Sequence, residues 1–213
     1  MPQSNLQMTQ PASIRNQSVS RPAPFQRFQD WFNQADKHPQ IREANAMNLA
    51  TVSSAGLPSN RMVLLKDFSP AGFTFYTNLE SHKGEDLKSN ANVALCFYWE
   101  ALGKQIRIEG HAKPVSPQDA DAYFTTRPRG SQIGAWASAQ SRPLDRLGDL
   151  TVKIAQQTTR FGVGPIPRPP FWSGFCVKPR AIEFWKRGKF RVHSRDHYSI
   201  WPNQSWRHTI LSP

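Results

Sequence analysis

The sequence predicts a mainly β fold with accessory helices (α+β), in which an antiparallel sheet closes as a barrel. Short segments of alternating apolar and polar residues recur between turns that contain Gly, Ser or Pro, as expected of strands. Helical periodicity is confined to a few separate segments. Short antiparallel strands joined by tight turns are typical of barrels. The 213 residues are enough for one domain, which we expect at 24–213.

The first expected element is a helix that follows a polar N-terminal tail. Residues 1–23 are rich in Gln, Ser and Pro, and we expect them to be disordered. From Pro24 onward, the aromatic residues Phe25, Phe28 and Trp31 recur at a spacing that places them on one face of a helix. Proline is favoured in the first turn, so a helix is predicted from Pro24.

The period of the apolar residues then changes to two, which predicts strands. We expect them at 47–51, 60–66, 73–77, 93–99 and 104–110, and again between 171 and 210. Three further helices separate these strands. Two begin where Ser81 and Ser116 can cap them, and they run to about 88 and 126. The third is expected over 144–160.

The formal charge of +12 indicates that the chain binds anions. Lys and Arg total 27 against 15 Asp and Glu. A surface that binds nucleic acid gathers its cations on one face or helix, but here they are scattered, with no run of five. We therefore expect pockets for small anions and no nucleic-acid partner. A part of the excess charge is expected to be ordinary solvated surface.

The chain lacks the signatures of membrane, metal and hydrolytic proteins. No stretch approaches the roughly 20 apolar residues that span a bilayer, and the N-terminus lacks the apolar core of a signal peptide, so we expect a cytoplasmic protein that does not bind membranes. There is no G-x-S-x-G, H-E-x-x-H or Walker motif, and the six His are scattered. We expect no metal site and a reaction that depends on an organic cofactor.

The most informative segment is 127–136, which is followed by Gln140 and Ser141. Its two arginines present forks of donors that fit phosphate oxygens in pairs. Ser131 adds a hydroxyl, and the glycines let the backbone approach a ligand closely. Tyr123 lies about one helical turn earlier. The segment therefore suits a small phosphorylated ligand.

Four other segments carry groups that can bind a ligand. They are Arg61 to Lys66, Tyr76 and Thr77 with His82 and Lys83, Gln105 in a strand, and Trp185 with Arg191, His193 and Arg195. The helix N-terminus near residue 82 favours anions, and alternation places residues 191, 193 and 195 on one strand face. Each segment also has a plainer structural interpretation: charges that flank a strand, an ordinary helix cap, or a charged edge strand.

In order and spacing, these segments resemble the pyridoxine/pyridoxamine 5′-phosphate oxidases, FMN enzymes of vitamin B6 metabolism. The resemblance extends from Pro24 to the C-terminus. It rests on Arg61–Lys66, Phe75–Asn78, Ser81–Lys83, Gln105, Arg127–Trp136, Gln140–Ser141, Phe171–Gly174, Ile182–Trp185 and Arg191–Arg195. It implies an FMN-binding split β-barrel with antiparallel, Greek-key-like strands, which works as a homodimer with FMN at the interface.

The resemblance also implies a role for each matching residue. FMN would contact Arg61, Met62, Val63, Leu64, Leu65, Lys66, Tyr76, Thr77, His82, Lys83 and Gln105 of one subunit. The second subunit would add Gln140, Ser141, Trp185 and Arg195. The substrate phosphate would lie among Lys66, Tyr123, Arg127 and Ser131. Arg191, Val192 and His193 would cover the pyridine ring, with Arg191 and His193 as the catalytic pair.

The implied reaction oxidises the 4′-alcohol or 4′-amine of a phosphorylated vitamer to the aldehyde, pyridoxal 5′-phosphate. A hydride passes to flavin N5, and O2 then reoxidises the flavin with release of hydrogen peroxide. Two alternatives stay open. One is a sibling oxidase on the same barrel that acts on another substrate, as in phenazine biosynthesis. The other is a protein that binds FMN or pyridoxal phosphate without turnover.

Three positions depart from the family's pattern. His82 stands where members often carry Arg, which implies a weaker grip on the FMN phosphate. Ser194 replaces a usual Asp, so a carboxylate beside Arg195 is missing. Ile210 stands at the start of the C-terminal segment in place of Arg. The last departure affects a secondary product site and leaves the core reaction as expected.

Overall fold

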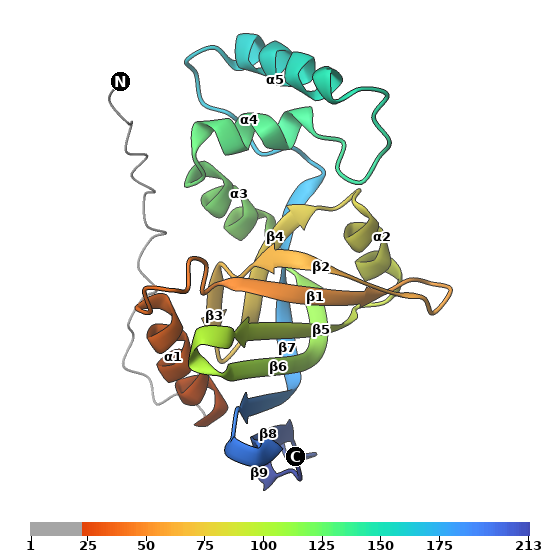
Figure 1. The fold of residues 1–213 in the computed structure, drawn as a ribbon. Coiled ribbons are helices and arrows are strands. Elements are labelled where there is room, and N and C mark those ends of the chain that lie inside the picture. The colour runs from red at the N-terminus through yellow and green to blue at the C-terminus, as the bar shows by residue number, and fades with distance from the viewer. Residues whose placement is uncertain (1–22) are drawn as a thin grey trace.

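The structure, a computed structural model, describes residues 23–213 and is built around one curled antiparallel sheet (Figure 1). The strands in this range are β1 (Ala46–Val52), β2 (Pro58–Leu64), β3 (Asp67–Ser69), β4 (Gly72–Asn78), β5 (Asn92–Trp99), β6 (Lys104–Pro114), β7 (Trp172–Lys186), β8 (Ser194–Ile200) and β9 (Trp206–Ile210). They lie in the order β2-β1-β5-β6-β7-β4-β3, with β8 on β7 and β9 on β8. The mainly β class with accessory helices is confirmed.

The alternation in β1 explains which face of the sheet is buried. Met47, Leu49 and Thr51 are buried, whereas the residues between them are partly exposed, as the two-residue period of a strand requires. At the end of β2, the Lys66 N–H donates to the Thr74 carbonyl of β4 (2.8 Å). This bond brings the segment after β2, at one edge of the curled sheet, against β4, next to the other edge, as in a split barrel.

Helix α1 (Ala23–Asp36) fills the inner side of the sheet with aromatic rings. Phe28 is fully buried, with its ring centroid 4.6 Å from that of Phe68, 4.9 Å from Phe73 and 5.3 Å from Phe97. Burial of one such side chain contributes about 1.5–3 kcal/mol, and edge-to-face contacts add to it. The aromatic spacing in the sequence therefore predicted this helix correctly.

The start of α1 also holds the C-terminal hairpin. Arg27 donates to Asp196 of β8 (2.7 Å), and Asp196 lies 2.8 Å from Nε2 of His208 in β9. Ala23, the last residue of the predicted disordered tail, is already helical. The rest of that tail, 1–22, lies outside the described residues, so its expected disorder stays a prediction.

Three helices gather at one end of the sheet, at the top of Figure 1. They are α3 (Pro117–Thr125), α4 (Arg129–Ala137) and α5 (Leu147–Phe161). A second, smaller core of Phe124, Ile133, Ile166 and Trp172 joins them to the start of β7. Helix α4 was not among the helices predicted from the sequence. Helix α5 begins three residues later than predicted, because the Asp149 carboxylate accepts the Arg146 N–H (3.1 Å) and caps the helix there.

The remaining elements are short. Helix α2 spans His82–Ser89, and single 3₁₀ turns occupy Glu100–Leu102 and Lys189–Arg191. Among the helices of the described range, none combines the length and apolar character needed to cross a membrane.

Candidate cofactor and substrate site

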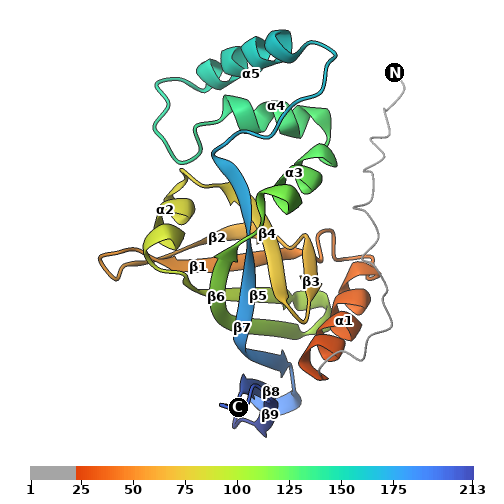
Figure 2. The ribbon, with the colours of Figure 1, turned by 180° about the vertical axis from the view of Figure 1, so that it is seen from behind.

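The predicted site residues fall into two groups at opposite ends of β7 (Figures 1 and 2). This strand begins beside α3 and α4 and ends beside the β8–β9 hairpin. The helical half-site comprises Arg61, Lys66, Tyr76, Thr77, His82, Lys83, Tyr123, Arg127, Ser131, Gln140 and Ser141. The hairpin half-site comprises Gln105, Trp185, Arg191, Val192, His193 and Arg195.

Lys83 is the centre of a buried cationic cluster at the N-terminus of α2. The Ser81 hydroxyl caps this helix by accepting the Gly84 N–H. Lys83 Nζ donates to Ser81 Oγ (3.2 Å) and to Gln140 Oε1 (2.9 Å), neither of which carries a negative charge. Burial, and then the positive charge of Arg61, lower the pKa of Lys83 to about 8. A bound anion would stabilise the protonated form of Lys83 and offset this effect.

A polar network holds Arg61 near Lys83. Arg61 donates to Thr51 Oγ1 (2.7 Å) and to Ser59 Oγ (2.6 Å). The Thr51 hydroxyl in turn donates to the Asp86 carboxylate (2.6 Å), which lies 3.9 Å from the Arg61 guanidinium. Burial lowers the pKa of Arg61. The network orients Arg61 through Asp86, whereas Lys83 has no carboxylate partner in the described part of the chain.

Gln140 belongs to this cluster in its own chain. Its Oε1 accepts from Lys83 Nζ and from Thr77 Oγ1 (3.4 Å). Ser141 follows in the left-handed region, with φ of 69°. The resemblance implied that Gln140 and Ser141 come from the second subunit. Within one chain, the contact with Lys83 places Gln140 in the helical half-site. The contribution of both residues to the partner's FMN stays a prediction.

His82 lies at the rim of the cluster. Its side chain is 59% exposed, and its Nε2 is 3.8 Å from the Asp86 carboxylate, four residues further along α2. An exposed imidazole at this distance binds an anion less firmly than a guanidinium fork does. The position where the family often carries Arg is therefore the weakest part of this cationic cluster.

Arg127 occupies an aromatic pocket with one of its donors unpaired. Its guanidinium carbon is 4.8 Å from the ring centroid of Trp172 and 5.5 Å from that of Phe124. The Nη1 atom is buried and has no hydrogen-bond partner in the described part of the chain. A buried, unpaired donor is costly in free energy. An acceptor such as a phosphate oxygen would complete this pocket.

Two tyrosines form the wall of the Arg127 pocket. Tyr76 and Tyr123 stack at 4.0 Å between ring centroids, and Tyr76 stacks on Trp172 at 5.3 Å. Burial raises the pKa of Tyr76 to about 12, so its phenol stays protonated at neutral pH. The pKa of Lys66 is lowered by burial and then by the charge of Arg127. Cations and aromatic rings thus meet at one place, as the sequence predicted for a phosphorylated ligand.

Ser131 lies in the first turn of α4, four residues after Arg127, and is exposed. The neighbouring glycines have open surroundings: a Cβ added at Gly130 or Gly134 would meet no atom within 4 Å. Nothing in the described chain therefore requires glycine at these two positions. Any need for a close backbone approach would come from a ligand.

Strand β2 supplies an open edge next to the helical half-site. It pairs only with β1 among the described strands. Met62 is 62% exposed and Leu64 is 36% exposed, whereas Val63 packs on the core and Leu65 is buried. An edge strand presents free N–H and C=O groups, which can bind the polar rim of a flat heterocycle.

In the hairpin half-site, three predicted residues stand side by side on adjacent strands. Gln105 of β6 pairs in register with Trp185 of β7, and Trp185 pairs with Arg195 of β8. Side chains paired in register lie on the same face of a sheet. The resemblance had placed Gln105 with the residues of the other half-site. The strand register groups it with Trp185 and Arg195.

Arg195 is neutralised and fixed within its own chain. It donates to both oxygens of Glu183 (2.7 and 3.2 Å) and to the carbonyl of Ser212 (2.9 Å). Glu183 also accepts from Arg107 (3.2 Å). The hydrogen bond from Arg195 lowers the pKa of Glu183. A two-pronged pair of this kind holds the guanidinium in one orientation.

The predicted placement of Arg191 and His193 on a strand is wrong. Strand β8 begins only at Ser194, and residues 187–193 form the turn that leads back from β7. Phe190 and Arg191 adopt positive φ angles of 54° and 62°. Reversal between neighbouring antiparallel strands commonly requires such left-handed residues. The two-residue alternation of a strand therefore does not predict which way the side chains of residues 191 and 193 point.

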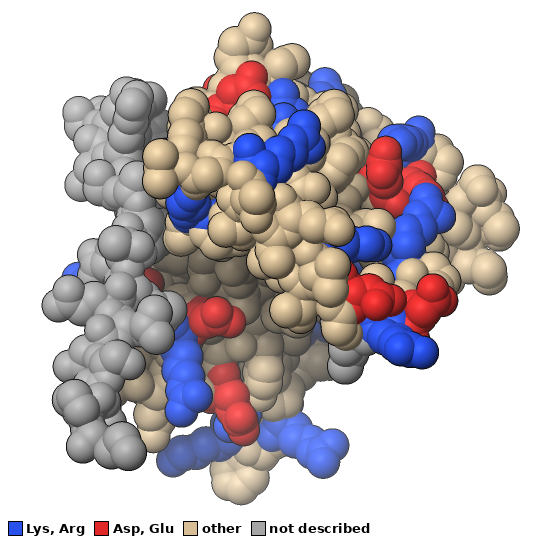
Figure 3. All heavy atoms as spheres, turned by 90° about the horizontal axis from the view of Figure 1, so that it is seen from above, with Lys and Arg blue, Asp and Glu red and all other residues tan. Residues whose placement is uncertain are grey.

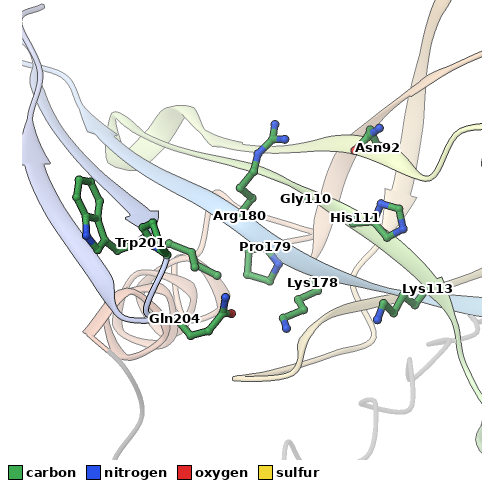
Figure 4. A pocket seen from close by; sticks show the side chains of 11 residues that line it. Asn92, Gly110, His111, Lys113, Lys178, Pro179, Arg180, Trp201 and Gln204 are labelled. Carbon is green, nitrogen blue, oxygen red and sulfur yellow. The ribbon is translucent and has the colours of Figure 1, made fainter.

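The basic residues outside the two half-sites are dispersed. Seen from the helical end, Lys and Arg lie at several separate places, some of them beside Asp or Glu (Figure 3). A hollow of about 420 Å³ beside β6, β7 and the β8–β9 turn is lined by Lys113, Lys178, Arg180 and Trp201, among others (Figure 4). None of its lining residues was predicted as a site residue.

Comparison with known proteins places the chain in a family. The family model described as pyridoxamine 5′-phosphate oxidase matches residues 36–160. A second model, the pyridoxine 5′-phosphate oxidase C-terminal dimerisation region, matches residues 172–213.

Similar proteins and structures agree with this match. A protein of Allorhizobium ampelinum named pyridoxine/pyridoxamine 5′-phosphate oxidase is 52% identical to this chain, over 81% of this chain and 83% of the relative. A protein of the same name from Bartonella quintana is 51% identical, over 88% of this chain and 90% of the relative. The crystal structure of PhzG from Burkholderia lata, in complex with tetrahydrophenazine-1-carboxylic acid, has a TM-score of 0.84 at 31% identity, covering 92% of this chain and 94% of that one. An FMN-binding protein of Nostoc punctiforme shares the fold, with a TM-score of 0.71 at 18% identity, covering 90% of this chain and 98% of that one. The chain belongs to the pyridoxamine 5′-phosphate oxidase family.

Proposed function

We propose that this protein is an FMN-dependent oxidase that converts pyridoxine 5′-phosphate and pyridoxamine 5′-phosphate to pyridoxal 5′-phosphate. The observation that carries the proposal is the pocket in which the unpaired Nη1 of Arg127 is buried against Trp172. Lys66, Tyr76 and Tyr123 supply further donors there. This donor set matches a phosphate group beside an aromatic ring. The names of the similar proteins support the same substrates.

The residues of the helical half-site also fit FMN. Lys83 is a buried cation and Arg61 a half-buried one, and burial lowers the pKa of each. Within residues 23–213, the Lys83 ammonium has no carboxylate partner. They would hold the FMN phosphate at the N-terminus of α2. The edge of β2 that faces away from β1, over residues 61–64, would bind the polar rim of the flavin ring. Bound FMN would accept a hydride from the 4′ carbon of the substrate and pass the electrons to O2, which yields hydrogen peroxide.

The complete site needs a second copy of the chain. Within one chain, β7 separates the helical half-site from the hairpin half-site, so Trp185 and Arg195 cannot reach the ligands held near Lys83 and Arg127. The match to a C-terminal dimerisation region over 172–213 supports a homodimer. We infer that each site combines the helical half-site of one subunit with the hairpin half-site of its partner.

The protein's own contribution to the reaction is orientation. Arg127 and Lys66 would clamp the phosphate at one end of the substrate. Arg191 and Val192 in the turn after β7 are exposed and can approach the ring from the partner subunit. Two anchors at opposite ends of a small ligand restrict its rotation, and such positioning contributes up to about 7–11 kcal/mol to a reaction.

A sibling oxidase is the second candidate, because PhzG is similar over nearly the whole chain. A phenazine precursor without a phosphate would leave the donors around Arg127 unpaired. We therefore rank this candidate below the vitamin B6 reaction.

The test is an anaerobic titration of the FMN-loaded protein with pyridoxine 5′-phosphate, followed by the visible absorption of the flavin. We expect the absorption to bleach and to return when air is admitted. Pyridoxine without the phosphate is the matched control and should bleach the flavin far less at equal concentration. Bound flavin that bleaches with neither compound contradicts the proposal. Bleaching with a dihydrophenazine carboxylic acid alone would favour the sibling activity.

A further inference from the structure

The turn between β7 and β8 contains one hydrogen bond that determines the chemistry of His193. The backbone N–H of Gly188 donates to His193 Nδ1 over 3.2 Å. A backbone N–H can only donate, so Nδ1 must present its lone pair. In the neutral ring the proton then resides on Nε2, the other nitrogen.

We propose that Gly188 is a positioning residue that fixes His193 in the Nε2–H tautomer, so that His193 meets the substrate as a hydrogen-bond donor. The proposal rests on the function proposed above, since it assumes that His193 faces the substrate. A histidine in this state donates to a lone pair on the substrate oxygen or neutral amine. It does not take up a proton through Nδ1, because that atom is already occupied.

The turn is built so that this bond cannot easily be exchanged for another. Gly188 is packed so tightly that an added Cβ would lie 1.8 Å from the carbonyl oxygen of Val192. The Val192 N–H donates back to the carbonyl of Lys189 (3.0 Å). Only glycine therefore fits at position 188 with the turn in this shape.

Two further features hold the imidazole in place. The His193 ring lies 4.7 Å from the ring of Trp185, at an angle of 44°. Phe190 and Arg191 both have positive φ angles, which residues with a Cβ rarely adopt. Strained backbone of this kind persists where the surrounding contacts determine it, and it is common at functional sites. Apart from Gly188, no hydrogen-bond partner of the His193 ring lies in the described residues, so Nε2–H is left for a ligand.

The tautomer can be measured directly by NMR on FMN-loaded protein with ¹⁵N-labelled histidine. Long-range ¹H–¹⁵N correlations distinguish a protonated ring nitrogen from one with a free lone pair, and the His193→Asn variant identifies the signals of His193. We expect the proton on Nε2 at a pH where the ring is neutral. A proton on Nδ1 would overturn the proposal, whatever the activity of the enzyme.

A matched pair of variants tests the role in turnover. Glutamine places an amide donor near the position of Nε2, whereas asparagine places its amide near Nδ1. We expect His193→Gln to keep kcat within about tenfold of the wild type, and His193→Asn to lose roughly 100-fold, as when a donor to a reacting group is removed. FMN affinity should be unchanged in both. Equal losses, or a more active Asn variant, would refute the donor role.

Gly188 itself is tested with a matched glycine. Gly188→Ala must displace the turn, so we expect kcat to fall by about as much as in His193→Asn, with FMN still bound and the NMR signals of His193 altered. Gly148→Ala in α5, where an added Cβ meets nothing within 4 Å, is the control and should keep full activity. Full activity in Gly188→Ala would remove the positioning role. Failure of the wild type to oxidise the substrate would instead refute the proposed function, and the NMR measurement would still decide the tautomer.

Discussion

The two half-sites differ in whether their cations are paired with carboxylates. In the helical half-site, Lys83 is buried and Arg127 is half-buried, and neither contacts a carboxylate among the residues that the structure describes. Burial lowers the pKa of each. In the hairpin half-site, Arg195 is bound by both oxygens of Glu183. Uncompensated buried charge is costly and signals a missing anion. This difference supports the proposal that ligand phosphates bind in the helical half-site and that the hairpin half-site orients the ring systems.

The largest effect is expected when the two half-sites are disabled in different chains. One chain carries Lys83→Met and the other His193→Asn, and neither homodimer should turn over well. In a mixed dimer one site receives both defects and the other receives none, so random mixing should restore about a quarter of wild-type activity. The measurement is turnover after the two proteins are unfolded and refolded together.

A second mixture serves as the control. Lys83→Met chains refolded with Gln140→Ala chains should not complement each other, because the two side chains touch within one chain. Recovery in this control, or no recovery in the first mixture, would contradict the assignment of residues to the half-sites.

Next in size is the effect of Arg127→Ala on the phosphorylated substrate. Loss of a charged donor to the phosphate should cost about 1.5–3 kcal/mol, or roughly 10- to 150-fold in kcat/KM. The loss should appear mainly in KM. Oxidation of pyridoxine without a phosphate should be almost unaffected, and this substrate is the internal control. An equal loss for both substrates would place the phosphate elsewhere.

The lowered pKa of Lys83 predicts that the affinity for FMN depends on pH. In the protein without FMN, Lys83 loses its proton near pH 8, below its ordinary range. FMN affinity should therefore fall as the pH rises above 8, by up to about tenfold per pH unit. Lys83→Arg, which stays charged, should flatten this dependence in a fluorescence titration of FMN. An affinity that is constant from pH 7 to pH 10 would exclude Lys83 from the phosphate site.

The stability of the FMN-free protein should change in the opposite direction. Between about pH 8 and the ordinary pKa of lysine, the unfolded chain binds more protons at Lys83 than the folded chain does. The contribution of Lys83 to the free energy of unfolding should therefore rise with pH in this window. The difference between wild type and Lys83→Met in urea unfolding isolates that contribution, and a difference that falls with pH would contradict the burial of a charged Lys83.

The smallest effect is expected from Gly174→Ala in β7. A Cβ at this position would lie 2.6 Å from the ring of Tyr76, so the stack of Tyr76 on Tyr123 must shift. Overpacking of this kind costs about 1–3 kcal/mol of stability. We expect a raised KM for the phosphorylated substrate and unchanged hydrogen bonding of Arg195 to Glu183, since that pair lies at the far end of β7. A variant with wild-type KM would show that the stack does not shape the phosphate pocket.

Local patterns predicted the elements, whereas non-local register decided the site. The period of two in β1 and the aromatic spacing of α1 are properties of neighbouring residues, and both predictions were confirmed. The adjacency of Gln105 with Trp185 depends on pairing between strands far apart in the chain, which one sequence does not reveal. The same limit applies to the contact of Gln140 with Lys83, which joins residues 57 positions apart in the chain.

Two local segments also escaped prediction, for a different reason. Helix α4 contains Gly130 and Gly134, which disfavour helices, but its apolar residues Ile133 and Ala137 are buried and override that preference. In the turn after β7, Phe190 adopts a left-handed backbone conformation although it is not glycine. Residues with a Cβ disfavour this conformation. In both places tertiary packing opposes the intrinsic preference of the residues.

The length of β7 also determines how the protein responds to dilution. One continuous strand carries residues of both half-sites and holds them apart, so a single chain cannot fold back to join its own halves. On the proposed dimer, catalytic competence is then a property of a pair of chains. Specific activity should stay constant at high protein concentration and fall toward zero once the chains dissociate. A fall in protein concentration would thus reduce the reaction rate by a larger factor than the concentration itself, because dissociation of one dimer removes both of its sites.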